Sequence, residues 1–301
     1  MAARFILSLD CEGKWGIADS LTPAEHATLS RERLVEAYSK ILALLDEFDV
    51  PATFGFVGLF GESPHSLAGL FPELDRLAER SPRYLGAALS DLRDGSRDGW
   101  HGDWAIEMVR SARAGHELAL HGMTHVPWGS IDRQFAEDEL ALLPMLHSPL
   151  RDAETFIFPR NEVAYVDLLA KAGIRGYRLA RKFRSRAASL ASEFNPFSAP
   201  DDSISPSGAL ARIPAGYFVN WRHGARRLVP RSLSRLRARQ MLLRAERTNR
   251  VVHYWIHPEN VASAPRTLDN LRDIVALSVS MRDAGRCEIM TQLDYCRVEA
   301  D

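Results

Sequence analysis

The stretch ELALHGMTHVPW, residues 117–128, places two histidines four positions apart directly after a strand-like segment. Residues 117–120 have the composition of a strand, and Gly122 lets the backbone turn, so that His121 and His125 can point to one spot. Neutral imidazole is a good zinc ligand, and a catalytic zinc site uses three protein ligands and one open position. The same spacing also occurs in ordinary hydrogen-bonded turns, so further ligands from other strand ends are needed to indicate a metal site.

A pair of carboxylates follows the first apolar segment of the chain. Residues 5–9 have the pattern of a buried parallel strand, which stops at Asp10 and Glu12. Because side chains alternate along a strand, these two acids share one face. Cys11 lies on the opposite face, where we expect a small buried filler rather than a nucleophile. The alternative is that the two acids are solvated and simply open a loop.

Strand-like and helical segments alternate along most of the chain. Strands are expected near 5–9, 51–57, 117–120, 155–158, 174–179, 250–256 and 287–290, and helices near 31–48, 71–79, 104–114, 131–146, 162–172 and 268–284. We expect a long loop at 81–103, no regular pattern at 180–211, and extended chain at 212–221. Alternation of this kind predicts the α/β class. Since polar residues follow several strands, the expected architecture is one domain, 1–301, folded as a distorted (β/α)7 TIM-like barrel with its active site at the carboxyl ends of the strands.

The charge of the chain is distributed unevenly, although its net value is −1. Residues 222–250 hold ten arginines and one acid, Glu246, so this Arg-rich insertion carries about +9 and the remainder about −10. Leu233, Leu236, Gln240 and Leu243 stand at helical spacing, which is consistent with a solvated helix that packs on one side. The other interpretation is a binding patch for an anionic carrier, either a nucleotide or a lipid pyrophosphate at the inner membrane surface. Nucleic-acid binding is not expected, because no nucleic-acid module accompanies the arginines.

The cysteines and the hydropathy of the chain bear on its compartment. Cys11, Cys287 and Cys296 form no spaced disulfide framework. The first strand begins without the apolar region of a signal peptide, and no run of about 18 apolar residues is present. We therefore expect a cytoplasmic protein without a transmembrane segment, either free or peripheral at the inner face of the membrane.

Four motifs together resemble the polysaccharide deacetylase family, also called the NodB-homology or carbohydrate esterase 4 group. They are DCEGKW, HGMTH, FPRN and WIHP, beginning at residues 10, 121, 158 and 255, and the resemblance extends from Phe5 to about Met290. These pieces are similar to a branch found with bacterial O-antigen and surface-polysaccharide synthesis proteins. The resemblance implies a set of roles: Asp10 as the base, Glu12, His121 and His125 as the metal ligands, and His257 as the acid.

The sequence departs from the family's pattern at two motifs. The family's first motif has two adjacent aspartates, whereas this chain has D-x-E, so the roles of Asp10 and Glu12 could be exchanged. The family's arginine-proline-proline-aromatic-glycine motif appears only as FPRN. Arg160 is then the candidate for orienting the base, and Asn161 for binding the sugar or offering its N–H to the oxyanion.

The predicted function is metal-dependent removal of an N-acetyl group from an amino sugar in surface-glycan assembly. A divalent metal, zinc before other transition metals, would polarise the amide carbonyl and lower the pKa of water. Asp10 would take a proton from water, and His257 would give one to the departing amine. The first alternative is a deformylase or other amidohydrolase, which product analysis would separate. The second is an inactive carbohydrate-binding protein.

Aromatic residues near the motifs are candidates for sugar contacts. Tryptophans stand at positions 15, 128, 221 and 255, and flat apolar rings suit sugar faces, although a single tryptophan more often belongs to the core. Trp15 and Trp128 are the better candidates because they directly follow metal-site residues, and Trp221 is the third. His253 receives a structural role, because four residues along a strand span about 13 Å and so separate it from His257.

Overall fold

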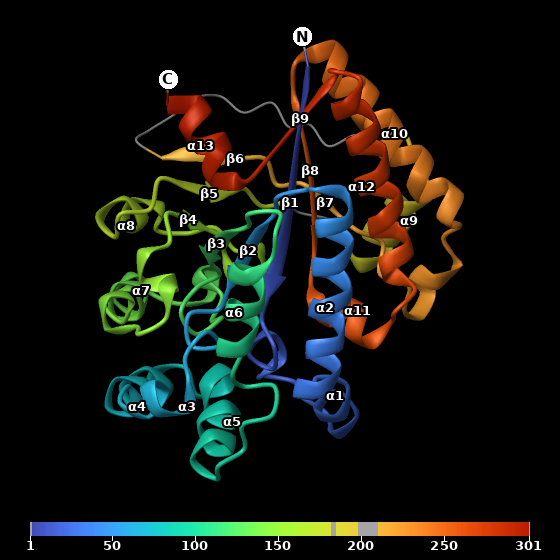
Figure 1. Ribbon diagram of the computed structural model, residues 1–301. Helices are drawn as coiled ribbons and strands as arrows, with labels where there is room; N and C mark the ends of the chain where they lie inside the picture. The colour runs from blue at the N-terminus through green and yellow to red at the C-terminus, as the bar shows by residue number, and fades with distance from the viewer. Residues whose placement is uncertain (1, 182–184, 198–209, 301) are drawn as a thin grey trace.

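The computed structural model describes residues 2–181, 185–197 and 210–300. Its strands are β1 (Ala3–Cys11), β2 (Thr53–Phe56), β3 (Glu117–Leu120), β4 (Thr155–Phe156), β5 (Gly176–Arg178), β6 (Ala211–Ile213), β7 (Tyr217–Phe218), β8 (Val251–Ile256) and β9 (Cys287–Met290). They form one parallel sheet in the order β6-β5-β4-β3-β2-β1-β8-β7, and β9 pairs with β1. The sheet curls into an open half-barrel, with β6 and β7 at its two ends (Figure 1).

Strand β1 is the centre of the fold. Its first half, Ala3–Ile6, pairs with β9, and its last half, Ser8–Cys11, pairs with β2, while β8 runs along its other edge. Its apolar side chains on both faces are fully buried, as expected for a strand inside a parallel sheet. Asp10 therefore emerges between β2 and β8, where the carboxyl ends of neighbouring strands meet.

Helices cover the outside of the sheet (Figure 1). They are α1 (Pro23–Thr28), α2 (Arg31–Phe48), α3 (Pro64–Ala68), α4 (Phe71–Arg80), α5 (Pro82–Arg93), α6 (Asp103–Ser111), α7 (Arg133–Leu140), α8 (Val166–Lys171), α9 (Arg186–Glu193), α10 (Arg231–Thr248), α11 (Pro258–Ser263), α12 (Thr267–Asp283) and α13 (Gln292–Ala300). Helix α2 begins where the Ser30 hydroxyl accepts a hydrogen bond from the backbone N–H of Arg33, and it buries an apolar face that includes Leu34, Tyr38 and Ile41. Helices α2, α12 and α10 lie along one flank of the sheet.

The expected α/β class is confirmed, the open half-barrel is consistent with the expected distorted (β/α) barrel, and three local expectations are wrong. The segment 81–103 is not a loop, since α5 occupies 82–93 and buries Leu85, Ala88 and Leu89 at helical spacing. The described part of 180–211 contains α9, and α13 follows the last strand. The buried side of α10 is formed by Ser234, Arg237, Ala238, Met241, Leu242 and Ala245, so the expected set of Leu233, Leu236, Gln240 and Leu243 is only half-buried.

Two expectations about membranes and thiols can be compared with the described residues. Within them, no helix combines the length and the apolar character that a membrane crossing requires. Cys11, Cys287 and Cys296 are buried free thiols. Cys11 is fully buried beside Leu9, which confirms its expected role as a core residue.

Candidate metal centre and active site

The carboxylate of Glu12 lies among three imidazole rings. Its Oε1 atom is 3.0 Å from Nε2 of His121, 3.0 Å from Nε2 of His125 and 3.3 Å from Nε2 of His257. These residues follow β1, β3 and β8, so strand ends that are far apart in the sequence meet at one point, as predicted. Among the described residues, two groups of three have all their ligand atoms within 4.8 Å of one another: Glu12, His121 and His125, and Asp10, Glu12 and His257.

Hydrogen bonds on the outer side of the rings fix which nitrogen faces Glu12 with a lone pair. The backbone carbonyl of Ile157 can only accept, so Nδ1 of His121 carries the proton that it donates over 2.9 Å. His257 likewise donates from Nδ1 to Oδ1 of Asn260 over 2.9 Å. In its neutral ring, Nε2 of His121 therefore presents a lone pair to a carboxylate oxygen. Such a convergence of acceptors fits a bound cation, which would satisfy both sides.

A buried carboxylate on α7 holds the turn that carries the paired histidines. Oε1 of Glu139 accepts from the backbone N–H of Thr124 over 2.8 Å and from its hydroxyl over 2.6 Å, and Oε2 accepts from Nε1 of Trp128 over 2.6 Å. Burial raises the pKa of Glu139 above its ordinary value, although these bonds oppose the change. The turn contains two left-handed residues, Gly122 with φ 67° and His125 with φ 62°. For His125 this conformation is uncommon, so the bonds to Glu139 hold the ring in its place.

Two further residues shape the position of Glu12. Oε1 of Glu259 accepts from the backbone N–H of Glu12 over 3.2 Å and of Gly13 over 2.6 Å. Burial raises the pKa of Glu259 to about 7, and the charge of Glu12 adds to the effect. Gly16 leaves the space that the Glu12 carboxylate occupies, because a Cβ atom there would stand 1.9 Å from Oε2 of Glu12.

Asp10 forms a two-bonded ion pair with Arg178, at the end of β5. Nη1 and Nη2 of Arg178 donate to the two carboxylate oxygens over 2.7 and 2.6 Å, and both side chains are almost fully buried. Burial alone would raise the pKa of Asp10, but the charge and hydrogen bonds of Arg178, with smaller contributions from His121 and His257, together hold the pKa below the ordinary value. Nη2 of Arg178 also donates to Oδ1 of Asn161 over 3.2 Å.

The expected position of Arg160 needs correction. Its guanidinium pairs with Asp19 and lies over the ring of Tyr84, 5.2 Å from the ring centroid, so it does not orient Asp10. Residues 160 and 161 both have left-handed backbone, with φ of 52° and 56°, and in this turn Asn161 rather than Arg160 reaches Arg178. The arginine that orients Asp10 is therefore Arg178, at the end of β5, and not Arg160.

A chain of hydrogen bonds links Arg178 to the buried His253 through Ser8. Nδ1 of His253 donates to the carbonyl of Pro214 over 2.6 Å, so its Nε2 accepts from the hydroxyl of Ser8 over 2.8 Å. The Ser8 oxygen in turn accepts from Arg178 over 3.2 Å. His253 is fully buried, and burial first and the Arg178 charge second lower its pKa to about 3. These contacts agree with the structural role expected for His253.

His257 faces Glu12 from the opposite strand end, after β8. Burial would lower its pKa, but the negative charges of Glu12, Asp10 and Glu259 raise it to about 10. The rings of Trp255 and Phe218 lie against the imidazole, with centroids 5.5 and 5.9 Å away. The ring therefore sits between carboxylates on one side and aromatic residues on the other.

The structure corrects two of the expected sugar contacts. Trp128 is completely buried against Phe156 and Phe158, and Trp15 is 2% exposed and donates from Nε1 to the carbonyl of Trp100. Neither ring offers a face to a ligand, because both complete the core beneath the loops that follow the motifs. Trp221 is half-buried and stacks on His223, and its predicted role in substrate binding stays a prediction.

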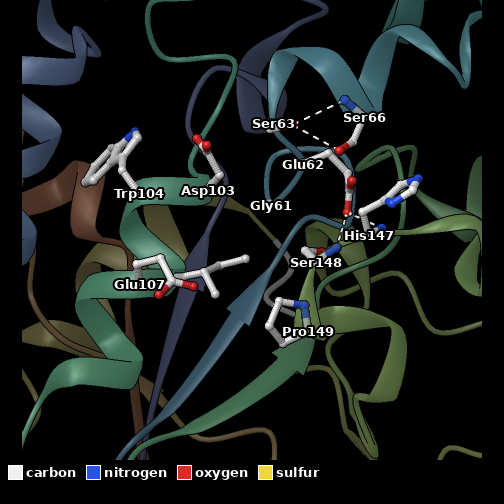
Figure 2. Close-up of a pocket in the computed structure, with 11 residues that line it drawn as sticks. Gly61, Glu62, Ser63, Ser66, Asp103, Trp104, Glu107, His147, Ser148 and Pro149 are labelled. Carbon is white, nitrogen blue, oxygen red and sulfur yellow. Dashed lines mark hydrogen bonds between the residues drawn. The ribbon is translucent and has the colours of Figure 1, made fainter.

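Two cavities lie near the ends of the strands. The first, of about 320 Å³, has Asn161, Phe218 and Trp255 in its wall and so adjoins the centre. The second, also of about 320 Å³, lies between α3 and α6 (Figure 2). Its wall includes the buried Glu62, whose Oε1 accepts from the backbone N–H groups of His147 and Ser148. It contains none of the metal-site candidates, so we place the chemistry at the first.

The comparisons with known proteins bear on the fold. No family model and no curated protein matches the sequence. Among solved structures, a protein from Mycobacterium smegmatis assigned as a polysaccharide deacetylase matches with a TM-score of 0.62 and 16% identity, over 98% of this chain and 88% of that one. A protein from Pseudomonas aeruginosa PAO1 assigned to the same class gives 0.57 and 11%, over 98% and 89%. An allantoinase gives 0.54 and 13%, over 98% and 89%. The chain therefore has the fold that these proteins share.

Proposed function

We propose that this chain is a divergent polysaccharide deacetylase that removes the acetyl group from an N-acetylated amino sugar with the help of a divalent metal. The observation that carries the proposal is the meeting of Glu12, His121 and His125 with Asp10 on one side and His257 on the other. The fold shared with proteins assigned as polysaccharide deacetylases supports the sugar substrate.

Zinc is the metal that these ligands suit best. Two imidazole nitrogens and one carboxylate oxygen form a common catalytic zinc set, and other divalent transition metals accept the same donors. When bound, the cation would polarise the amide carbonyl and lower the pKa of water.

Each of the remaining residues has a separate task in amide hydrolysis. Asp10 lies with Oδ2 4.0 Å from Nε2 of His121 and accepts the proton of the attacking water, while Arg178 keeps its carboxylate ionised and oriented. His257 holds a proton at Nε2 and gives it to the departing amine, since its neighbouring carboxylates favour the protonated ring. Asn161, which is fixed by Arg178, is placed to contact the sugar.

Product and metal analysis test this function together. The zinc-loaded protein should release acetate from N-acetylated sugars, and removal of metal by a chelator should abolish the release. Asp10→Asn should keep the metal and lose turnover, because the substitution removes the base and leaves the three ligands. Stoichiometric release of acetate by metal-free protein would refute the proposal, and loss of metal in Asp10→Asn would instead show that Asp10 and Glu12 exchange roles.

A second candidate is an amidohydrolase that acts on another amide, including a formyl group. The fold shared with an allantoinase favours keeping this candidate, because it shows that the scaffold is not confined to proteins assigned as sugar deacetylases. Release of formate rather than acetate, or turnover restricted to amides without a sugar, would select it.

Part of the proposal concerns where the substrate is carried. We propose a role in O-antigen or other surface-glycan synthesis, with the Arg-rich segment 222–250 receiving an anionic nucleotide or lipid carrier in the cytoplasm or at the inner membrane face. The charge of this segment supports the proposal. Three of its ten arginines pair with acids of the fold: Arg231 with Asp273, and Arg226 and Arg237 with Glu193.

A further inference from the structure

Three residues that line the cavity contact residues of the candidate centre. Asn161 lines the cavity and accepts a hydrogen bond from Arg178, the partner of Asp10. Phe218 and Trp255 also line it, and their rings pack against His257. A group held in this cavity is therefore next to a substrate amide at the centre.

The wall of the cavity carries a surplus of positive charge. Glu193, which is 2% exposed, accepts from Arg226 over 2.7 Å and from Arg237 over 2.6 Å. One carboxylate thus stands between two guanidinium groups, of which Arg226 lines the cavity and Arg237 does not, so this cluster has a net positive charge. Arg181 is a further guanidinium in the wall.

Arg226 is both fixed and able to bind. Nη1 donates to Glu193, Nη2 donates to the hydroxyl of Ser189 over 2.8 Å, and the guanidinium lies over the ring of Phe218 at 5.4 Å. A guanidinium has five N–H donors, so others are left for a ligand. The side chain is 21% exposed, which leaves it accessible from the cavity. Among the arginines of 222–250, Arg226 is the one that lines this cavity.

We propose that this cavity is a subsite for an anionic group of the substrate, a phosphate or a carboxylate next to the N-acetylated sugar. Guanidinium groups bind such oxyanions through charge-assisted hydrogen bonds, and a fixed guanidinium loses less freedom on binding. Trp255 and Phe218 offer apolar ring surface to the sugar between the anion and the amide. The inference rests on the proposed function, and it identifies the substrate as an acidic or phosphorylated amino sugar.

Three substrates test the subsite: methyl N-acetylglucosaminide, N-acetylglucosamine 1-phosphate, which differs from it only at C1, and the methyl glycoside of the uronic acid of N-acetylglucosamine, which differs from it only at C6. The wild-type protein should prefer an anionic substrate to the neutral one by about tenfold or more in kcat/KM. Arg226→Gln should lower this ratio by about tenfold. Arg226→Lys should keep part of the ratio, because it retains the charge without the fork of donors. The anionic substrate whose kcat/KM ratio to the neutral substrate falls in Arg226→Gln identifies the group, phosphate or carboxylate, that the subsite binds.

Arg33→Gln is the matched control, because Arg33 is an exposed arginine on α2, outside the segment 222–250, and does not line the cavity. Its ratio should equal that of the wild-type protein. A wild-type ratio near one, or an equal ratio in Arg226→Gln and Arg33→Gln, would overturn the subsite. Should Arg226→Gln fail to fold, Arg181→Gln takes its place in the comparison.

Binding separates failure of the subsite from failure of the proposed function. If no substrate is hydrolysed, the proposed function fails, and calorimetry with N-acetylglucosamine 1-phosphate then tests the subsite alone. Binding that weakens about tenfold in Arg226→Gln and not in Arg33→Gln supports the subsite without any turnover. Binding that is undetectable, or unchanged in Arg226→Gln, overturns it.

Discussion

Arg178 donates two hydrogen bonds to Asp10 although 168 residues separate them in the chain, and neither side chain reaches solvent. The pair joins β5 to β1 across the inside of the half-barrel. Both charges are removed from water, so each is stabilised mainly by the other, and the loss of one would leave the other buried without a counter-charge. The candidate base is thus part of the core of the fold as well as of the site.

Arg178→Met should therefore affect stability and activity together. Without the guanidinium, the pKa of Asp10 rises, because burial is no longer opposed by its strongest favourable partner. We expect a loss of about 3–5 kcal/mol in the free energy of unfolding by urea, and loss of turnover near neutral pH. Arg160→Met is the control, since Arg160 pairs with Asp19 instead. Equal stability of the two variants would contradict this account of the buried pair.

His125→Ala should remove the metal from the proposed centre. The substitution deletes one of three ligands and leaves Glu12 and His121 in place, so affinity for zinc should fall by at least about a hundredfold in competition with a chromophoric chelator. His65→Ala, at an exposed position on α3, should bind zinc like the wild-type protein. Full zinc stoichiometry in His125→Ala, with loss of zinc in His257→Ala, would assign the metal to the second group of ligands, Asp10, Glu12 and His257.

Gly16→Ala should disturb the metal site with little effect on the fold. The new methyl group would stand 1.9 Å from Oε2 and 2.9 Å from Cβ of Glu12, so the side chain must turn and the loop at 12–16 must shift slightly to make room. We expect zinc affinity to fall about 10- to 100-fold, as when an outer-shell partner is changed, while the unfolding midpoint in urea stays close to that of the wild-type protein. Gly86→Ala on α5, where a methyl group meets nothing within 4 Å, is the control and should leave zinc affinity unchanged. Unchanged affinity in Gly16→Ala would show that Glu12 does not need its present position.

His253→Gln should reduce the acid sensitivity of the fold. The ring has its pKa lowered to about 3 in the folded protein, against 6.5 ordinarily, so the unfolded chain binds the extra proton as the pH falls below 6.5. Stability is therefore complete above this pH and declines by about 1.4 kcal/mol per pH unit below it for this one histidine. His116, with its pKa lowered to about 4, adds a similar slope in both proteins. Urea unfolding between about pH 6.5 and pH 4.5 should give a shallower slope for the variant, and identical slopes would contradict the expectation.

The sequence pattern was sufficient to predict the alternation of strands and helices and the ligand candidates at the strand ends. Helix 31–48 and strands 117–120 and 287–290 agree with the structure residue for residue, because their apolar periodicity and capping residues are strong local signals. The ligands could be predicted because they directly follow strands, and parallel strands bring their carboxyl ends to one edge. By contrast, the pattern does not predict α5. Its three buried apolar positions are interspersed with polar residues, which weakens the helical periodicity of the segment.

The supporting residues could not be predicted in the same way, because they act on the site from other elements. Arg178 had one local signal, a charged residue inside the expected strand 174–179. Glu139 had another, since it lies on the same helix face as Phe135 and Ala136 and an acid in such a position needs a partner. Neither signal names the partner, which depends on the closure of the sheet. Trp15 and Trp128 were misjudged for the converse reason, since proximity in sequence to a ligand does not distinguish a core ring from an exposed one.

The hydrogen bonds that Glu139 accepts from Thr124 and Trp128 mean that the protein interior preorganises the backbone around His125 in the absence of a cation. The imidazole ligands are already oriented for a metal ion, so little of the binding free energy would be spent on ordering the backbone. Chelation and reloading should then be reversible, and different divalent ions should be interchangeable without any change in the backbone.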